Sequence, residues 1–297
     1  MKYPQVTVQV INFNGGEKII RGLNKVFEMN FPLFEVIVID NGSTDGSKEK
    51  IKKMFPQILL VENKKNLGSV LAHNQGFKLA RGEFILSLDD DAVVSRDLLT
   101  SLLKIIEKDK LIGIIVPKLY YFKRPTTFNS TGFFLDPFFG KTKDLGIGKQ
   151  DCGQLDFQRE VDYVPSAVIL LRKEVINNVG GMNEDYFVYY EDVDWCKRIR
   201  DAGYKIIYTP TAKAWHDCKT PSELSKFRVY HYSRGKTFFM IRNFSIIHNV
   251  IFSFFLFTLY SPFRVMLFLF KRKPSLIKSY LLGIYDGFTG KKRIELP

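Results

Sequence analysis

Three consecutive carboxylates follow an apolar stretch of the sequence. Asp89, Asp90 and Asp91 come directly after the apolar run at 84–88. Adjacent carboxylates repel one another strongly unless a cation or a proton lies among them. A hard divalent ion such as Mg²⁺ or Mn²⁺ takes oxygen ligands and could then hold a diphosphate. A solvated turn or a helix cap would contain the same residues, but the matching position of Asp40 after another apolar run favours a ligand site.

The elements that must position these carboxylates alternate between strands and helices. Apolar runs predict buried strands, and apolar residues at helical spacing predict helices. We expect strands at 6–11, 35–39, 58–61, 84–88 and 112–116, and helices at 17–29, 69–80 and from a cap at Ser95 to about 108. This alternation predicts an α/β fold with a largely parallel sheet, in which ligands bind beyond the carboxyl ends of the strands.

Glycine-rich phosphate loops are absent from the sequence. It contains no GxxxxGK[ST] segment, and residues 12–16 after the first expected strand read NFNGG rather than GxGxxG. This argues against a P-loop NTPase and against a dinucleotide dehydrogenase. A metal held by the Asp cluster would then have to carry the negative charge of a phosphate.

Several segments share the order and residue types of one enzyme family. They are VQVINFNG at 8–15, VIDNGSTDGS at 38–47, NLG at 66–68, NQG at 74–76, ARGEFILSL at 80–88, the triple Asp, VGGMNEDYF at 179–187, YEDVD at 190–194, Arg198, GY at 203–204 and WH at 215–216. With these motifs the chain resembles family 2 of the inverting glycosyltransferases, which have the GT-A fold. The most similar branch is rhamnosyltransferase-like, and its members build cell-surface polysaccharides and glycolipids.

The resemblance implies a binding site for a UDP-, GDP- or dTDP-sugar donor. By this resemblance Asp40 and Asn41 contact the nucleotide base, and Ile11 and Phe13 line its pocket. Asp90 helps to hold the ribose. We expect residues 117–160 to form a loop or hairpin that shapes the acceptor side, and the choice of sugar, nucleotide and acceptor to depend on the pocket shape in 117–170 and 218–242.

The resemblance also implies a metal site and a general base. Asp89 and Asp91 form the DxD pair that meets the ribose and a Mn²⁺ or Mg²⁺ ion, and His216 approaches the metal or the diphosphate. The base is Asp192, with Glu191 as the second candidate. The chemistry requires such a carboxylate, because the acceptor hydroxyl must lose a proton on the face opposite the leaving group.

Structural roles for these residues remain open at this point. Carboxylates in the first turn of a helix at 190–200 are common partners of the helix dipole. We accept that role for Asp194, which is spaced to pair with Arg198. His216 could be an ordinary hydrogen-bonded residue at a strand end.

Charge and cysteine content narrow the class of protein. The 297 residues carry 44 Lys and Arg against 31 Asp and Glu, a net charge of +13 that favours anionic partners. Cys152, Cys196 and Cys218 are widely spaced and odd in number, as in a reducing compartment, and we expect all three to be buried thiols. The first residues lack the pattern of a signal peptide, so we expect the main body in the cytosol.

The C-terminal part differs in composition from the rest. Residues 243–263 carry no formal charge and are rich in Phe, and 265–270 are apolar again. From 243 to 297 the chain has eight Lys and Arg and two Asp and Glu. We therefore expect a catalytic domain at 1–220 and a helical, basic segment at 221–297 that attaches to an anionic membrane surface without crossing it. A helix that spans the membrane, buried helices and a dimer interface are the less favoured alternatives.

Three functional hypotheses follow. The first is a glycosyltransferase at the cytoplasmic face of the membrane, peripheral or monotopic, with a lipid-linked or glycan acceptor. The second is a sugar-phosphate nucleotidylyltransferase, whose glycine-rich, basic N-terminal signature is missing at 8–16. The third is a basic protein that binds nucleic acid or lipid; we expect no nucleic-acid partner, because the excess charge is concentrated behind the apolar tail.

Overall fold

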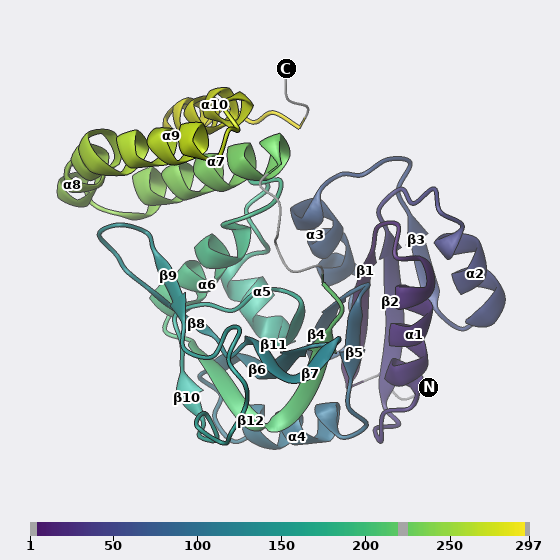
Figure 1. The fold of residues 1–297 in the computed structure, drawn as a ribbon. Helices are drawn as coiled ribbons and strands as arrows, with labels where there is room; N and C mark the ends of the chain where they lie inside the picture. The colour runs from purple at the N-terminus through teal and green to yellow at the C-terminus, as the bar shows by residue number, and fades with distance from the viewer. Residues whose placement is uncertain (1–4, 219–224, 295–297) are drawn as a thin grey trace.

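The computed structural model describes residues 5–218 and 225–294. A ten-stranded mixed sheet lies between two layers of helices, and the helices of the C-terminal part form a further layer beside one edge of this body (Figure 1). The strand order is β10-β12-β6-β11-β4-β1-β2-β3, with β5 paired to β12 and β7 paired to β6.

The elements have the following bounds. The strands are β1 (Val6–Asn12), β2 (Phe34–Asp40), β3 (Leu59–Glu62), β4 (Phe84–Asp89), β5 (Ala92–Val94), β6 (Ile112–Tyr121), β7 (Arg124–Ser130), β8 (Phe133–Leu135), β9 (Thr142–Asp144), β10 (Arg159–Glu160), β11 (Val168–Arg172) and β12 (Lys205–His216). The helices of the body are α1 (Gly16–Phe27), α2 (Ser47–Met54), α3 (Ser69–Leu79), α4 (Leu98–Ile106), α5 (Lys173–Val179) and α6 (Glu191–Asp201). The C-terminal helices are α7 (Lys226–Asn243), α8 (Ile246–Phe255), the π-helical turn η1 (Leu256–Tyr260), α9 (Ser261–Phe270) and α10 (Ser275–Thr289).

The N-terminal half of the sheet is parallel, as the alternation of elements predicts. β1 pairs in parallel with β2 and β4, and β2 with β3. The register places Asn12 beside Asp40 and Ile11 beside Asp89, so the carboxyl ends of these strands meet at one edge of the sheet. β11 is inserted antiparallel between β4 and β6, and β5 and β7 add antiparallel pairs that make the sheet mixed.

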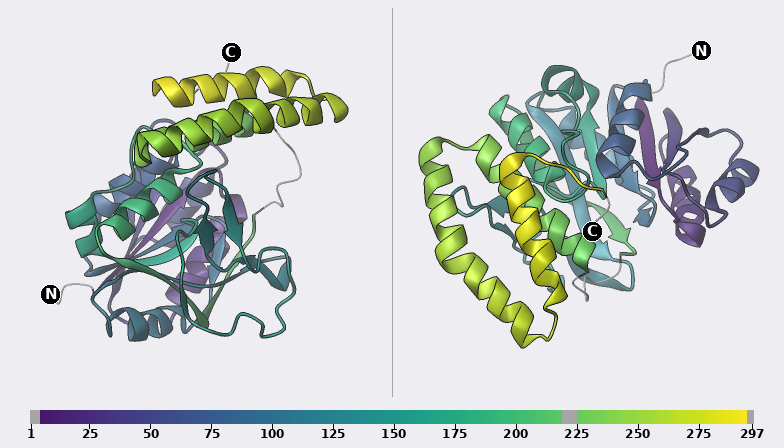
Figure 2. Two further views of the ribbon diagram at one scale, coloured as in Figure 1. Left: turned by 90° about the vertical axis from the view of Figure 1, so that its left-hand side faces the viewer. Right: turned by 90° about the horizontal axis from the view of Figure 1, so that it is seen from above.

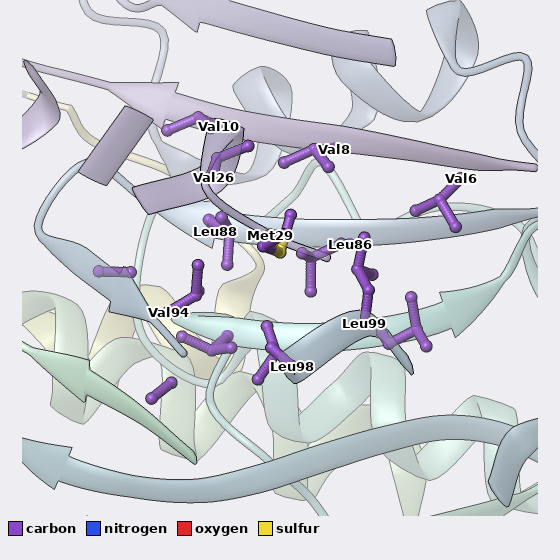
Figure 3. Packing of buried hydrophobic residues seen from close by; sticks show 14 of the residues in the cluster. Val6, Val8, Val10, Val26, Met29, Leu86, Leu88, Val94, Leu98 and Leu99 are labelled. Atoms are coloured by element: carbon purple, nitrogen blue, oxygen red, sulfur yellow. The ribbon is translucent and has the colours of Figure 1, made fainter. Parts of the chain in front are cut away.

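Side chains on alternate positions of β1 explain the two covered faces. Val6, Val8 and Val10 are almost fully buried and pack with residues of α1 and α4, including Val26 and Leu98 (Figure 3). A parallel strand in the middle of a sheet is buried on both of its faces, so other elements must cover each face. α3, α5 and α6 supply the second cover, where α6 also meets α7.

The C-terminal helices form their own layer (Figure 2). α10 packs closely along α7 because two glycines face it: a Cβ at Gly283 would lie 2.6 Å from the Tyr230 carbonyl oxygen, and one at Gly287 would lie 2.6 Å from Thr237 Cβ. By contrast, an 18-residue window of the continuous helix Ile246–Phe270 has a mean hydropathy of 1.7, and only 17% of that window is buried. Within the described residues it is the one helix long and apolar enough to cross a membrane.

Local differences from the sequence-based expectations concern caps and exposure. The hydroxyl of Ser95 caps no helix: α4 begins at Leu98, whose N–H is bonded to the Ser95 carbonyl instead. The prediction of three buried thiols is wrong for Cys152, which is exposed on the loop before β10, whereas Cys196 is buried in the core. The unassigned stretch after 116 extends β6 and turns back as β7, which confirms the expected hairpin.

Candidate active site

A cleft of about 460 Å³ opens beyond the carboxyl ends of β1, β2 and β4. Ile11, Phe13 and Asn41 line it. Phe13 is 44% exposed, so an apolar ring is available for stacking. Gly68, at φ +91°, lies so close to Phe187 that a Cβ would be 2.7 Å from the ring, which brings that ring into the wall of the cleft.

Asp40 occupies a different place from the expected one. It is fully buried and does not line the cleft; its carboxylate accepts hydrogen bonds from Asn12 Nδ2 (2.6 Å) and the Ser43 N–H (2.9 Å). Asn41 lies on the cleft wall, with its amide held by Asn66. Asp40 therefore shapes the turn that positions Asn41, which reaches the cleft wall although its side chain is also buried.

Asp89, Asp91 and His216 come together on the floor of the cleft. Their ligand atoms all lie within 4.8 Å of one another. His216 Nε2 is 2.9 Å from Asp91 Oδ1 and 3.8 Å from Asp89 Oδ2. The antiparallel pairing of β12 with β5, which sets His216 beside Ala92, brings the imidazole to the carboxylates from 125 positions further along the chain.

The electrostatics of this cluster fit a divalent cation. Burial raises the pKa of Asp89 to about 6. Burial alone would lower the pKa of His216, but Asp91 and Asp89 raise it to about 11. The same imidazolium, helped by Lys18, outweighs burial at Asp91 and lowers the pKa of that carboxyl. The two carboxylates thus hold the proton of the His216 imidazolium between them. A metal ion would have to replace that proton, and two carboxylate oxygens with one neutral imidazole nitrogen then form a suitable ligand set for Mn²⁺.

Asp90 anchors the neighbouring loop. Its Oδ2 accepts a hydrogen bond from the Phe13 N–H (2.9 Å), which fixes the aromatic ring at the cleft entrance. Burial raises its pKa to about 7. Asp90 also lines the cleft, so the predicted contact with a ribose hydroxyl is sterically open.

A second pocket of about 260 Å³ lies beside the first and contains Glu191 and Asp192. The two pockets share Ser69, Asp89 and Val188 in their walls. The first turn of α6 therefore presents two carboxylates in a pocket that shares a wall with the cleft of Asp89, Asp91 and His216.

The two carboxyls of this turn differ in accessibility. Glu191 is buried, and its Oε2 has no hydrogen-bond partner among the described residues. Burial raises its pKa above that of Asp192, which burial raises to about 6. Asp192 is half-buried, so it loses its proton first and faces the pocket. Asp194 pairs with Arg198 at 3.0 Å, which confirms its structural role.

The turn before α6 is strained and is held by the C-terminal layer. Tyr189 and Tyr190 both have positive φ (66° and 70°), a conformation uncommon for residues other than glycine. Gly235 of α7 packs against this turn, so that a Cβ there would lie 2.5 Å from the Tyr189 carbonyl oxygen. Such strain persists where the surroundings enforce it and is concentrated at functional sites.

Several wall residues come from the segments that we expected to shape the acceptor side. Thr142, Tyr163 and Ser166 line the second pocket, and Tyr232 of α7 closes it. Phe227, also of α7, reaches the first cleft. The part of 218–242 at 219–224 lies outside the described residues. No motif indicates the individual residues, because their roles depend on how α7 lies across the body.

Comparisons with known proteins agree with this geometry. Residues 7–177 match the model of the family described as Glycosyl transferase family 2. The chain is 25% identical over 216 residues to a poly-beta-1,6-N-acetyl-D-glucosamine synthase of Staphylococcus aureus, covering 71% of this chain and 49% of the relative. It is 27% identical over 237 residues to glycosyltransferase AglE of Haloferax volcanii, covering 76% and 72%. The chain spans about half or less of the length of several curated relatives that it matches.

Solved structures share the fold. The mannosyltransferase PcManGT from Pyrobaculum calidifontis, in complex with GDP-Man and Mn²⁺, has a TM-score of 0.61 at 18% identity over 98% of this chain and 89% of that one. S. aureus TarS 1–349 in complex with UDP-GlcNAc has a TM-score of 0.60 at 18% identity over 96% and 81%. With the family match over more than half of its length, the chain belongs to glycosyl transferase family 2.

Proposed function

We propose that this protein is an inverting glycosyltransferase that moves a sugar from a nucleotide-diphospho-sugar to a hydroxyl of a lipid-linked or polysaccharide acceptor. One observation carries the proposal: the cleft with the Asp89–Asp91–His216 cluster and the pocket with Asp192 share a wall at Asp89. A donor in the first pocket would place its anomeric carbon near that wall, with the base on the other side.

The chain's own residues divide the work. Ile11, Phe13 and Asn41 would bind and orient the nucleotide. Asp192 would take the acceptor's proton while the acceptor oxygen bonds to the anomeric carbon and the bond from that carbon to the diphosphate oxygen breaks. Asp89, Asp91 and His216 would hold Mn²⁺ or Mg²⁺. When bound, the ion would stabilise the charge that gathers on the leaving diphosphate.

The donor can be found by measuring nucleotide release from a panel of UDP-, GDP- and dTDP-sugars with Mn²⁺. PcManGT was solved with GDP-Man and TarS with UDP-GlcNAc, so both nucleotides belong in the panel. The dTDP-sugars test the rhamnosyltransferase-like branch. We expect release of one nucleotide well above the rest, and release of none, with any metal, would refute the proposal.

We further propose that the helix Ile246–Phe270 docks into a membrane surface with its exposed side. Ile246, Val250 and Phe254 are 64–79% exposed on α8, and Met266 and Leu269 of α9 are 55–60% exposed. Each residue of an α-helix rotates the face by about 100°. The extra residue of the η1 turn offsets α9 by that angle, which brings Met266 and Leu269 back to the side occupied by Phe254.

Charge supports the same docking. Lys271, Arg272 and Lys273 are exposed directly after the apolar helix. Exposed apolar side chains next to basic residues are typical of helices that lie in the interface of an anionic leaflet. We therefore propose that the segment 221–297 is membrane-associated, in a peripheral or monotopic position on the cytoplasmic face, and that its first helix α7 also completes the pockets of the catalytic domain at 1–220 through Phe227 and Tyr232.

A further inference from the structure

A cavity of about 310 Å³ lies within the C-terminal layer, between α7, η1, α9 and α10. Its wall contains three cationic side chains, Arg228, Lys236 and Arg264, together with three tyrosines and the hydroxyl residues Ser233 and Thr237. None of its lining residues is acidic. The cavity therefore has positive charge and hydroxyl groups at its surface, which is the composition of an anion-binding site.

The cations of the cavity lack protein counter-ions within the described residues. Lys236 is only 6% exposed, and its recorded partner is the Tyr260 ring, 4.8 Å from Nζ. The buried Nε of Arg264 has no hydrogen-bond partner, and its guanidinium stacks on Phe268. Arg228 forms no ion pair in the part of the chain that the structure describes.

Arg234, also on α7, is a buried cation with a structural role and can be compared with Lys236. Arg234 is 2% exposed, and its guanidinium donates hydrogen bonds to the carbonyls of Lys291 (2.6 Å) and Gly290 (3.3 Å). Lys236, two residues further along α7, has no such carbonyl acceptor among the described residues. A buried charge without a partner is costly, so it indicates a ligand that completes the site.

The surroundings of Lys236 increase that cost. Burial, together with the positive charges of Lys141 and Arg264, lowers the pKa of Lys236 to about 8, while Asp136 opposes this shift. A bound anion would offset both the burial and the repulsion. Arginine and lysine together with hydroxyl groups are the usual ligands of phosphate in proteins.

The position of the cavity connects it to two other features. Arg228, Tyr232 and Lys236 follow one another at four-residue spacing on one side of α7. Tyr232 also lines the pocket that contains Asp192. On the opposite side, the cavity is bounded by η1 and α9, whose outer side chains form the exposed apolar face.

We propose that this cavity binds the phosphate or diphosphate that joins the sugar of a lipid-linked acceptor to its lipid. The inference rests on the proposed function and specifies its acceptor. The lipid chain would leave along the apolar helix into the membrane, and the sugar would pass Tyr232 toward Asp192. Free inorganic phosphate or pyrophosphate shares the chemistry and is the other source of such an anion.

The test is flotation of the full chain with three kinds of phosphatidylcholine vesicle: plain, with a polyisoprenyl diphosphate, and with phosphatidylglycerol at equal surface charge. EDTA keeps divalent ions from the Asp89 cluster. Loss of a hydrogen bond to a charged group removes about 1.5–3 kcal/mol, or roughly 10- to 100-fold in affinity. We expect Lys236→Met and Arg264→Gln to lose the preference for the diphosphate lipid by that factor.

Lys278→Gln is the matched control, because Lys278 lies on α10, is exposed and does not line the cavity. It should reduce binding to both anionic vesicles equally and keep the preference. Thermal unfolding of each variant checks the fold, and Arg264→Gln, at a half-buried position, serves if Lys236→Met is unstable.

Three results would overturn the proposal: no preference in the wild type, an equal loss in Lys278→Gln, or binding of inorganic pyrophosphate without any preference among vesicles. Vesicle binding does not depend on sugar transfer. A wild type that prefers the diphosphate lipid but releases no nucleotide from any donor would therefore refute the proposed function and leave the cavity assignment intact.

Discussion

Replacing Asp192 by asparagine keeps the size of the side chain and removes its ability to accept a proton. Asp192 is half-buried in the second pocket, where its recorded hydrogen bond is from the Val193 N–H (2.8 Å) to Oδ1. Oδ2 is therefore available to an acceptor hydroxyl. Loss of a general base lowers rates by about 10²–10⁴-fold, which corresponds to about 2.7–5.4 kcal/mol in the activation barrier.

The pH profile gives a second magnitude for the same residue. Because burial raises the pKa of Asp192 to about 6, the wild-type rate should be constant above pH 7 and fall as the pH is lowered through 6. At pH 5, one unit below that pKa, about one tenth of the enzyme has a charged base, so we expect about a tenfold loss. The base must be deprotonated to act, so the loss is on the acid side.

The assay is single-turnover transfer with a saturating donor, together with calorimetric titration of the nucleotide. Asp192→Asn should bind nucleotide normally and lose transfer. Asp201→Asn is the control, because Asp201 is exposed at the far end of the same helix and the same charge is removed. Normal turnover in Asp192→Asn with an inactive Glu191→Gln would move the base to Glu191, and normal turnover in both would refute a carboxylate base on this turn.

Three further outcomes test the metal site, the strained turn and the membrane face. Chelation should abolish transfer and Mn²⁺ or Mg²⁺ restore it, and Asp91→Asn should weaken Mn²⁺ binding in calorimetry; full turnover in EDTA would contradict the metal site. Gly235→Ala should lower the melting temperature and kcat, because the added Cβ would lie 2.5 Å from the Tyr189 carbonyl oxygen and such overpacking costs about 1–3 kcal/mol. An unchanged kcat would show that the packing of α7 on this turn does not position the base. The double variant Phe254→Ser with Met266→Ser should be released from neutral vesicles. High salt alone should release the wild type only in part from anionic vesicles, because salt does not screen apolar burial. Retention of the double variant on neutral vesicles would argue against docking by this face.

The tail is better tested by substitution than by truncation. α10 covers α7, and the buried Asp286 of α10 accepts hydrogen bonds from Tyr230 (2.8 Å) and Arg293 (2.6 Å). Removing everything after 243 would expose that side of α7 and disturb Tyr232 in the second pocket. Surface substitutions on α8 and α9 leave this packing in place.

Sequence reasoning was most successful where a local pattern implies a position in a parallel sheet. The apolar runs fixed which residues form β1, β2 and β4, and parallel strands in register end at the same edge. The prediction that Asp40 and Asp89 follow strands that end at the same edge of the sheet needed nothing further. The candidate site of Asp89, Asp91 and His216 required the family resemblance as well, since His216 reaches it through the pairing of β12 with β5.

Burial of individual side chains could not be predicted in the same way. Asp40 and Asn41 are adjacent at a strand end, yet the carboxylate turns inward to Asn12 and Ser43 while the amide lies on the cleft wall. Adjacent residues on a turn differ in direction by small changes in dihedral angle, and the sequence pattern does not report those angles. Ser95 shows the same limit, because its carbonyl and not its hydroxyl meets the first turn of α4.

The sequence by itself determined the family, the parallel half of the sheet, the acidic strand ends and the apolar, basic character of the C-terminal part. These properties depend on residue type and spacing over short distances. Only the tertiary structure decided that Tyr232 closes the pocket of Asp192, and that Arg228, Lys236 and Arg264 surround one cavity without a carboxylate. Both depend on how α7 crosses the body and on how α10 packs against α7. That packing arises from contacts between residues 50 or more positions apart in the chain.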